Sequence, residues 1–115
     1  MTAPALPTEI EPAEASTALA SGALLLDVRE PDEHLAGHVR GSLHIPLGEL
    51  PARLETVPAD RDIIVACRSG RRSAQAADLL RNQQFRVANL KGGLQAWHAA
   101  ALDVETADGA RGSVA

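Results

Sequence analysis

The chain has 115 residues, of which 45% are hydrophobic and 23% are charged, a composition typical of one soluble globular domain with its own core. Its formal net charge of −4 argues against a nucleic-acid or anionic-membrane surface. The single cysteine excludes an internal disulfide, a Cys-x-x-Cys redox pair and a zinc site built from several thiolates. With no signal-peptide pattern and no apolar stretch near the roughly 18 residues that span a bilayer, we expect a cytoplasmic protein.

The first half of the chain alternates between helix-forming stretches and short apolar runs. Residues 1–9 are rich in Pro and Ala and are expected to be loose, with a short strand at their end. Residues 11–20 predict a helix, because a proline suits the first turn and Ser-Gly follows the stretch. The continuous apolar run at 24–28 predicts a buried strand. We then expect a brief helix over 31–36, a strand over 41–45 and a helix within 47–57. Pro51 moves the expected start of that helix toward Glu49.

The second half continues this alternation around the run Ile63-Ile-Val-Ala66. This run is the most apolar and β-branched of the chain and predicts a central strand. After it we expect a helix over 73–84, a strand over 85–90 and a helix over 94–101. In the last helix, Trp97 is interpreted as a core lid rather than a ligand platform. From Asp103 onward the composition turns to Ala, Gly, Asp and Thr, which predicts a frayed tail. The chain thus divides into a loose segment over 1–9, a single domain over 10–102 and a tail over 103–115.

Strands that alternate with helices predict an α/β fold, in which a parallel sheet is covered on both faces by right-handed crossovers. Ligands bind such sheets at the carboxyl ends of the strands. Cys67 stands at that end of the predicted central strand, and a helix starts just after a short loop. The position of Cys67 therefore fits a functional site.

The loop after Cys67 has the features of an anion site. A strand that turns tightly into a helix presents unpaired N–H groups, which form a concave nest for an anion. Gly70 permits the turn. Three arginines add positive charge that no turn requires: Arg68, Arg71 and Arg72. Such surroundings lower the pKa of a cysteine and favour its thiolate. We interpret Cys67 as a nucleophile; the alternative is a small buried hydrophobe, which a cysteine after an apolar run often is.

Three stretches of the chain resemble the rhodanese (sulfurtransferase) family, and together they cover most of it. Residues 26–46, LDVREPDEHLAGHVRGSLHIP, resemble the family's D-V-R…G-H-I-x-G-A-x-x-I-P signature. Residues 64–73, IVACRSGRRS, resemble its active loop C-x-x-G-x-R-S. Residues 90–97, LKGGLQAW, resemble its L-x-G-G-x-x-x-W. Val39 and Ser42 stand where Ile and Ala are commoner in the family, and a packed strand tolerates both changes.

This resemblance implies a rhodanese-like three-layer α/β sandwich, with a mostly parallel five-stranded sheet and helices on both faces. It also implies a thiosulfate sulfurtransferase, in which Cys67 takes up a sulfane sulfur as a persulfide and passes it on. The substrate would be bound by the loop residues Arg68, Ser69, Gly70, Arg71 and Arg72. Arg68 and Arg71 would meet the substrate anion, whereas Arg72 matches an arginine that tends to brace the loop in this family.

The implied partners are a small-molecule sulfur donor and an external acceptor. The donor would be thiosulfate or a persulfide, and the acceptor a low-molecular-weight thiol, cyanide or a thioredoxin-like protein. Because the chain has no second cysteine to resolve a persulfide, its acceptor must be a second molecule. We expect no cofactor, no metal, no nucleic acid and no membrane, and the sequence does not define an oligomeric state.

Polar residues near the loop are assigned a supporting role. Asp27 and Arg29 end a neighbouring strand and Ser73 begins the next helix, and we expect all three to support the loop. Surface polar residues at a strand end are the alternative for Asp27 and Arg29. Glu30 and Glu33 are interpreted as a solvated helix start, where carboxylates are favoured.

The four histidines are not expected to form a site. His34 and His38 are four residues apart, but Gly37 interrupts the helix between them and no further metal ligand is evident. His44 and His98 belong to no constellation of chemical groups.

Two other functions are compatible with a thiol loop. Thiol phosphatases and arsenate reductases of this fold use Cys-x5-Arg, but here the sixth position after Cys67 is Ser73, and arginines occupy the fourth and fifth. A sulfur-relay or interaction module would instead receive persulfide from a partner protein and pass it on. Nothing in the sequence separates that module from an enzyme.

Overall fold

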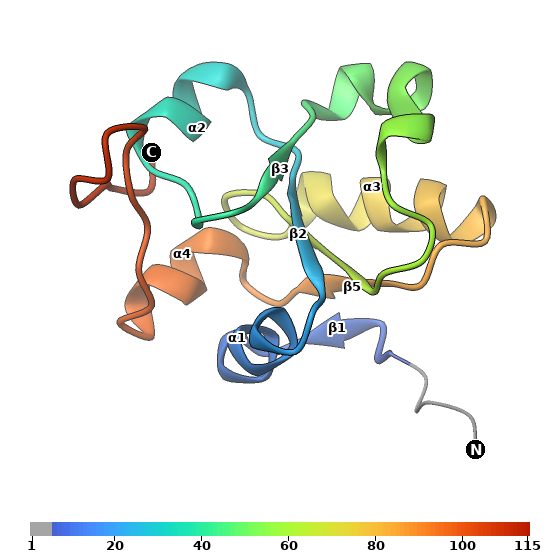
Figure 1. The fold of residues 1–115 in the computed structure, drawn as a ribbon, viewed down its shortest axis with the longest axis horizontal. Helices are drawn as coiled ribbons and strands as arrows, with labels where there is room; N and C mark the ends of the chain where they lie inside the picture. The colour runs from blue at the N-terminus through green and yellow to red at the C-terminus, as the bar shows by residue number, and fades with distance from the viewer. Residues whose placement is uncertain (1–5) are drawn as a thin grey trace.

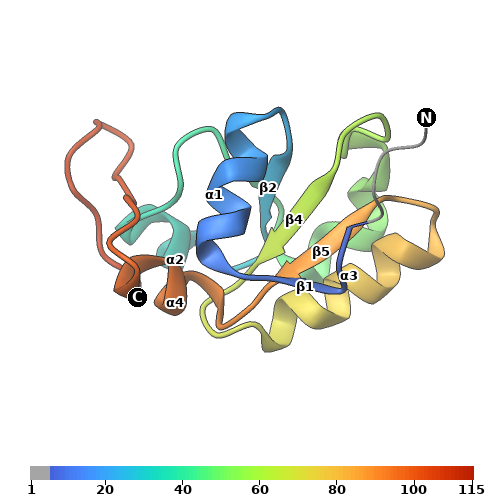
Figure 2. The same cartoon turned by 90° about the horizontal axis from the view of Figure 1, so that it is seen from below.

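One sheet of five strands forms the centre of the computed structural model, which describes residues 6–115. The strands are β1 Glu9–Ile10, β2 Leu24–Asp27, β3 Leu43–His44, β4 Ile63–Ala66 and β5 Val87–Leu90. They lie in the order β1-β5-β4-β2-β3, and each neighbouring pair is parallel. The predicted central strand is therefore confirmed as β4, between β2 and β5. Figure 1 labels the edge strands β1 and β3, and Figure 2 labels β4 itself. Because the strands are parallel, the loops that follow β2, β4 and β5 meet at one edge of the sheet.

Helices connect the strands and cover both faces of the sheet (Figure 2). They are α1 Pro12–Ala20, α2 Pro31–Ala36, α3 Arg71–Asn82 and α4 Gly93–Ala99, with a 3₁₀ segment η1 at Leu47–Thr56. In β4, Ile63 and Val65 pack with α3 and η1, whereas Ile64 and Ala66 pack with α1 and α4. All four residues of β4 are buried, as expected for a parallel strand covered on both sides. The predicted α/β sandwich is confirmed.

The helix predicted within 47–57 is present, but its expected start near Glu49 is wrong. The segment η1 is a 3₁₀ helix that begins at Leu47 rather than near Glu49. Pro51 lies inside it and has no N–H to donate, and Arg53 departs from helical geometry with φ −124° and ψ 21°. A short, kinked 3₁₀ segment is the form that this proline leaves available.

Several other bounds differ from the prediction by small amounts. Helix α3 begins at Arg71, before the predicted start at Ser73, because Gly70 takes a left-handed conformation and lets the helix follow at once. Arg71 and Arg72 therefore belong to the first turn of α3. Strands β3 and β5 are shorter than the predicted 41–45 and 85–90.

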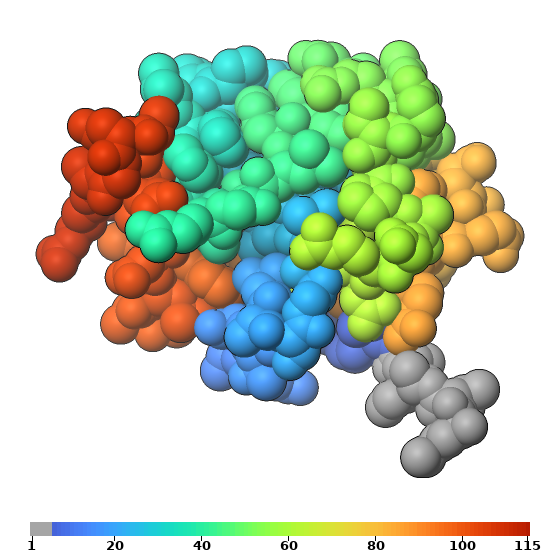
Figure 3. All heavy atoms as spheres, viewed as in Figure 1, coloured from blue at the N-terminus to red at the C-terminus, as the bar shows by residue number. Residues whose placement is uncertain are grey.

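The prediction that residues 103–115 fray is wrong, because they pack against the domain. Val104 is 4% exposed and belongs to the core cluster that contains Trp97. The Ser113 N–H donates to the Ala36 carbonyl at 3.0 Å. Figure 3 shows this C-terminal segment lying against residues of α2 and of the stretch that follows it. The segment is held partly by main-chain hydrogen bonds, which any residue can form, so its composition did not reveal the packing.

The N-terminal residues lead to the edge of the sheet. Glu9 and Ile10 form β1 beside β5, whereas residues 1–5 of the predicted loose segment lie outside the described part of the chain. None of the helices between residues 6 and 115 has both the length and the apolar composition needed to cross a bilayer.

Candidate active site

The loop between β4 and α3 folds its backbone around the sulfur of Cys67. Cys67 directly follows β4, and Gly70 precedes α3 with φ 103°, a left-handed conformation that strains any residue with a side chain. The Gly70 N–H donates to Cys67 Sγ at 3.1 Å, and the Ser73 N–H donates to it at 3.4 Å. Two backbone donors at a helix N-terminus therefore point at one sulfur atom, which is the geometry of an anion nest.

Opposing effects set the acidity of Cys67. Burial by itself raises the pKa of the thiol, and the residue is only 1% exposed. Hydrogen bonds from the Ser73 side chain and from the N–H groups of Ser73, Gly70 and Ser69 favour the thiolate and outweigh burial. The pKa of Cys67 therefore lies below its ordinary value, so that more of the nucleophilic thiolate is present at neutral pH.

The stretch L-x-G-G holds the other side of the loop. The Leu94 N–H donates to the Cys67 carbonyl at 2.8 Å, and the Gln95 N–H donates to the Arg68 carbonyl at 3.0 Å. A Cβ on Gly93 would lie 2.5 Å from the Arg68 carbonyl oxygen and 2.6 Å from that of Cys67. Only glycine therefore lets the N-terminus of α4 approach the loop closely enough to make these bonds.

The three loop arginines differ in their contacts. Arg72 forms a two-pronged ion pair with Glu33 of α2, with Nη1–Oε1 at 2.6 Å and Nη2–Oε2 at 2.8 Å. These hydrogen bonds from Arg72 are the main reason that the pKa of Glu33 is lowered to about 2. Arg68 and Arg71 are exposed, and no ion pair or hydrogen bond within residues 6–115 engages their side chains. The interpretation of Glu33 as a merely solvated helix start is wrong, because it ties α2 to the cysteine loop.

Asp27 and Arg29 form an ion pair at the carboxyl end of β2, with both side chains 0% exposed. Arg29 Nη2 donates to Asp27 Oδ2 at 2.8 Å and to the Gly37 carbonyl at 2.7 Å. Arg29 Nη1 donates to the Glu33 carbonyl at 3.2 Å. These bonds lead to α2 and its C-terminal end rather than to the cysteine loop. Any support that Asp27 and Arg29 give the loop passes through Glu33 and Arg72.

A buried polar pair lies behind the sulfur. Ser73 Oγ lies 3.4 Å from Cys67 Sγ and 2.5 Å from Asn89 Oδ1. Asn89 Nδ2 donates to the Gly70 carbonyl at 3.0 Å. Asn89 belongs to β5, is 4% exposed, and is missing from the residues predicted on sequence. The signal that could have found it is an amide side chain inside an otherwise apolar strand.

Comparison with known proteins assigns the family. The model of the rhodanese-like domain family matches residues 11–100. The chain belongs to this family. It is 40% identical over 87 residues to a sulfurtransferase of Allochromatium vinosum, a match that covers 75% of this chain and 81% of that protein. It is 37% identical over 98 residues to the thiosulfate sulfurtransferase GlpE of Stutzerimonas stutzeri, covering 84% and 90%. The crystal structure of a rhodanese-related protein from Thermoplasma volcanium matches with a TM-score of 0.81 and 30% identity, covering 85% and 97%.

Three histidines of this rhodanese-like domain stack on one another near Arg29, with His44 Nε2 2.7 Å from the Arg29 carbonyl oxygen. The His34 ring lies 4.1 Å from the His38 ring and 4.2 Å from the His44 ring, centroid to centroid. Burial, and then the neighbouring His44 and His38, lower the pKa of His34 to about 4. The stack shows that His44 does belong to a constellation. Among residues 6–115, no group of three or more His, Cys, Asp or Glu is arranged to hold a metal ion.

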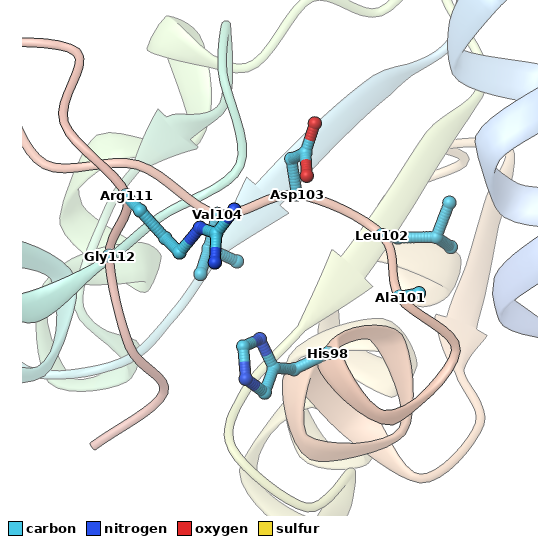
Figure 4. A pocket seen from close by; sticks show the side chains of 7 residues that line it. All are labelled: His98, Ala101, Leu102, Asp103, Val104, Arg111 and Gly112. Carbon is cyan, nitrogen blue, oxygen red and sulfur yellow. The ribbon is translucent and has the colours of Figure 1, made fainter.

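A cavity of the rhodanese-like domain lies apart from the cysteine loop. It has a volume of about 240 Å³ and is lined by the end of α4 and the C-terminal segment. His98 and Arg111 point into the same space from opposite sides (Figure 4). All of its lining residues lie between 98 and 112, so this cavity is separate from the sulfur of Cys67.

Proposed function

We propose that this rhodanese-like domain moves a sulfane sulfur from thiosulfate or a persulfide, through a persulfide on Cys67, to an external thiol. The observation that carries the proposal is the pair of N–H groups, from Gly70 and Ser73, at 3.1 and 3.4 Å from Cys67 Sγ. They stabilise a thiolate before the reaction and an anionic persulfide after it. The relatives named sulfurtransferase and thiosulfate sulfurtransferase support this assignment.

The first half-reaction loads the cysteine. The Cys67 thiolate attacks the outer sulfur of thiosulfate, a new S–S bond forms, and the S–S bond of thiosulfate breaks. Sulfite leaves with the bonding electron pair. Arg68 and Arg71, which are exposed beside the loop, attract the dianionic donor.

The second half-reaction removes the sulfur from the Cys67 persulfide. An acceptor thiolate or cyanide attacks the outer sulfur of the persulfide, and Cys67 leaves as a thiolate with its electron pair. The products are an acceptor persulfide or thiocyanate. The loop amides again bind the thiolate that forms, so the same donors serve both half-reactions.

The geometry disfavours a thiol phosphatase or arsenate reductase. In Cys-x5-Arg enzymes an arginine six positions after the cysteine holds the tetrahedral oxyanion. Here Ser73 occupies that position and is 0% exposed, with its hydroxyl between Cys67 and Asn89. The preceding residue, Arg72, is held by Glu33.

The enzyme proposal is tested by measuring the formation of thiocyanate from thiosulfate and cyanide. Wild-type protein is expected to turn over, and Cys67→Ser to lose turnover because serine cannot form the persulfide. Intact mass after exposure to thiosulfate should show one added sulfur atom on the wild type and none on Cys67→Ser. Undiminished turnover by Cys67→Ser would show that Cys67 is not the nucleophile.

A sulfur-relay module is the second candidate, and Cys67 as the single cysteine is compatible with it as with the enzyme. Without a resolving thiol, the loaded persulfide is expected to persist until an external acceptor arrives. Mass spectrometry of the loaded protein would compare its discharge by a small thiol with discharge by a thioredoxin-like protein. Fast discharge by the protein acceptor alone would favour the relay, and fast discharge by small thiols would favour the enzyme.

A further inference from the structure

The Ser73 hydroxyl has two neighbours that compete for one hydrogen. Its oxygen lies 2.5 Å from Asn89 Oδ1 and 3.4 Å from Cys67 Sγ. A hydroxyl has a single hydrogen to donate, whereas its lone pairs can accept from another group. The shorter contact is the stronger hydrogen bond, so the hydrogen lies mainly toward Asn89 and the sulfur receives the weaker bond.

The amide of Asn89 cannot be turned the other way. Its Nδ2 donates to the Gly70 carbonyl at 3.0 Å, and Asn89 is 4% exposed. Exchanging the oxygen and nitrogen of the amide would place its oxygen against the Gly70 carbonyl, two acceptors face to face in a buried site. The network itself therefore assigns Oδ1 to Ser73.

We propose that Asn89 is a positioning residue that competes with the Cys67 thiolate for the hydrogen of the Ser73 hydroxyl. The hydroxyl can donate fully to the thiolate only by leaving Asn89 Oδ1 without a partner. While Asn89 engages it, the hydroxyl gives the thiolate only part of its bond, and the N–H groups of Gly70 and Ser73 supply the rest.

The arrangement has a chemical use. A thiolate that is too strongly stabilised is a weaker nucleophile, because nucleophilicity falls as the thiol pKa falls. By engaging the hydroxyl, Asn89 leaves Cys67 ionisable through the loop N–H groups and limits the further stabilisation that a fully released hydroxyl would add. The inference rests on the nucleophile role proposed for Cys67, and it concerns how that nucleophile is tuned.

Two variants of matched size separate this role from simple packing. Asn89→Leu and Asn89→Asp both lose the Nδ2 donor to Gly70, but only Asp keeps an oxygen that can accept from Ser73. The charged side chains of the loop and α2, Arg68, Arg71 and the Arg72–Glu33 pair, are unchanged in both. The pKa of Cys67 would be read from the pH dependence of its alkylation rate by iodoacetamide, which requires no sulfur transfer.

Asn89→Leu should lower the pKa of Cys67 by about one unit, a roughly tenfold rise in the thiolate-to-thiol ratio at low pH. Asn89→Asp should not lower it, because its carboxylate still accepts from Ser73 and adds a negative charge beside the sulfur. The fall should disappear when Ser73→Ala is combined with Asn89→Leu, since no hydroxyl remains to be released. The proposal would be overturned if the pKa of Cys67 rose in Asn89→Leu. It would also be overturned if this pKa fell equally in Asn89→Leu, in Asn89→Asp and in the double variant with Ser73→Ala. Wild-type protein that is alkylated normally at Cys67 but does not turn over thiosulfate would instead count against the proposed function.

Discussion

The three arginines at the cysteine loop use their positive charge in two different ways. Arg72 is engaged by Glu33 at 2.6 and 2.8 Å, so its charge is committed to holding the loop against α2. Arg68 and Arg71 are exposed and have no protein partner among residues 6–115. Although the chain has a net charge of −4, these two arginines make the charge at the opening of the loop positive, which would attract the proposed anionic donor.

Arg68→Ala or Arg71→Ala should raise the KM for thiosulfate by about two- to fivefold, since an exposed charge contributes about 0.5–1 kcal/mol. The increase should shrink at high salt, where exposed charges are screened. Steady-state kinetics at two ionic strengths would measure it. Arg53→Ala is the matched control, because Arg53 pairs with Glu49 in η1. An unchanged KM in both loop variants would mean that the amides alone bind the donor.

Between elements, a few contacts join three motifs that are separate in the sequence. The Glu33–Arg72 pair links α2 to the start of α3, and Gly93 brings α4 onto the loop. Arg29 ties β2 to the carbonyls of Glu33 and Gly37. The cysteine loop is therefore held from two sides by elements that follow β2 and β5, the strands that flank β4.

The Glu33–Arg72 link should make stability depend on pH. The pKa of Glu33 is about 2 in the folded protein and 4.5 in its ordinary state, so the unfolded chain takes up a proton first as the pH falls. The stabilisation is thus fully present above pH 4.5 and is lost between pH 4.5 and about 2.

Glu33→Gln should therefore destabilise the fold at neutral pH by about 1 kcal/mol, the scale of a well-formed but partly exposed pair. The difference from wild type should vanish toward pH 2 in thermal unfolding followed by circular dichroism. Glu49→Gln, in an exposed pair with Arg53, should change little. A Glu33→Gln deficit that is constant with pH would contradict the ion-pair origin.

For the whole molecule, the C-terminal segment completes the fold rather than trailing from it. Val104 is buried with Trp97, whose Nε1 donates to the Asp103 carbonyl at 3.0 Å. The backbone near Ser113 passes so close to Gly37 that no side chain fits between them. This contact covers the end of α2, the helix that carries Glu33.

Gly37→Ala should destabilise the protein by about 1–3 kcal/mol, the usual cost of overpacking. A Cβ there would meet the Ser113 carbonyl oxygen, and would lie 2.7 Å from the Ser113 nitrogen. The φ of Gly37 is 171°, extended backbone that any residue adopts, so the collision alone causes the loss. Gly48→Ala, with nothing within 4 Å of the added Cβ, should be close to neutral in thermal unfolding. A Gly37→Ala protein as stable as wild type would show that this segment does not pack there in solution.

Local patterns account for what the sequence alone predicts well. The apolar run Ile63–Ala66 and its turn signals identify the central strand. The spacing from Cys67 to Gly70 and the arginines identifies the loop, because tight turns need particular residues at particular offsets. Pro51 is a misleading signal, because it moves the predicted helix start toward Glu49, whereas η1 begins at Leu47 and contains the proline.

The tertiary structure decided which distant groups meet. Glu33 reaches Arg72 across 39 positions, and Asn89 reaches Ser73 across 16, because β4 lies between β2 and β5. The docking of Ser113 on Gly37 uses backbone atoms that every residue carries. The cysteine loop could thus be predicted from local residue types. The contacts that brace it depend on strand order and on main-chain approach, which local residue types do not encode.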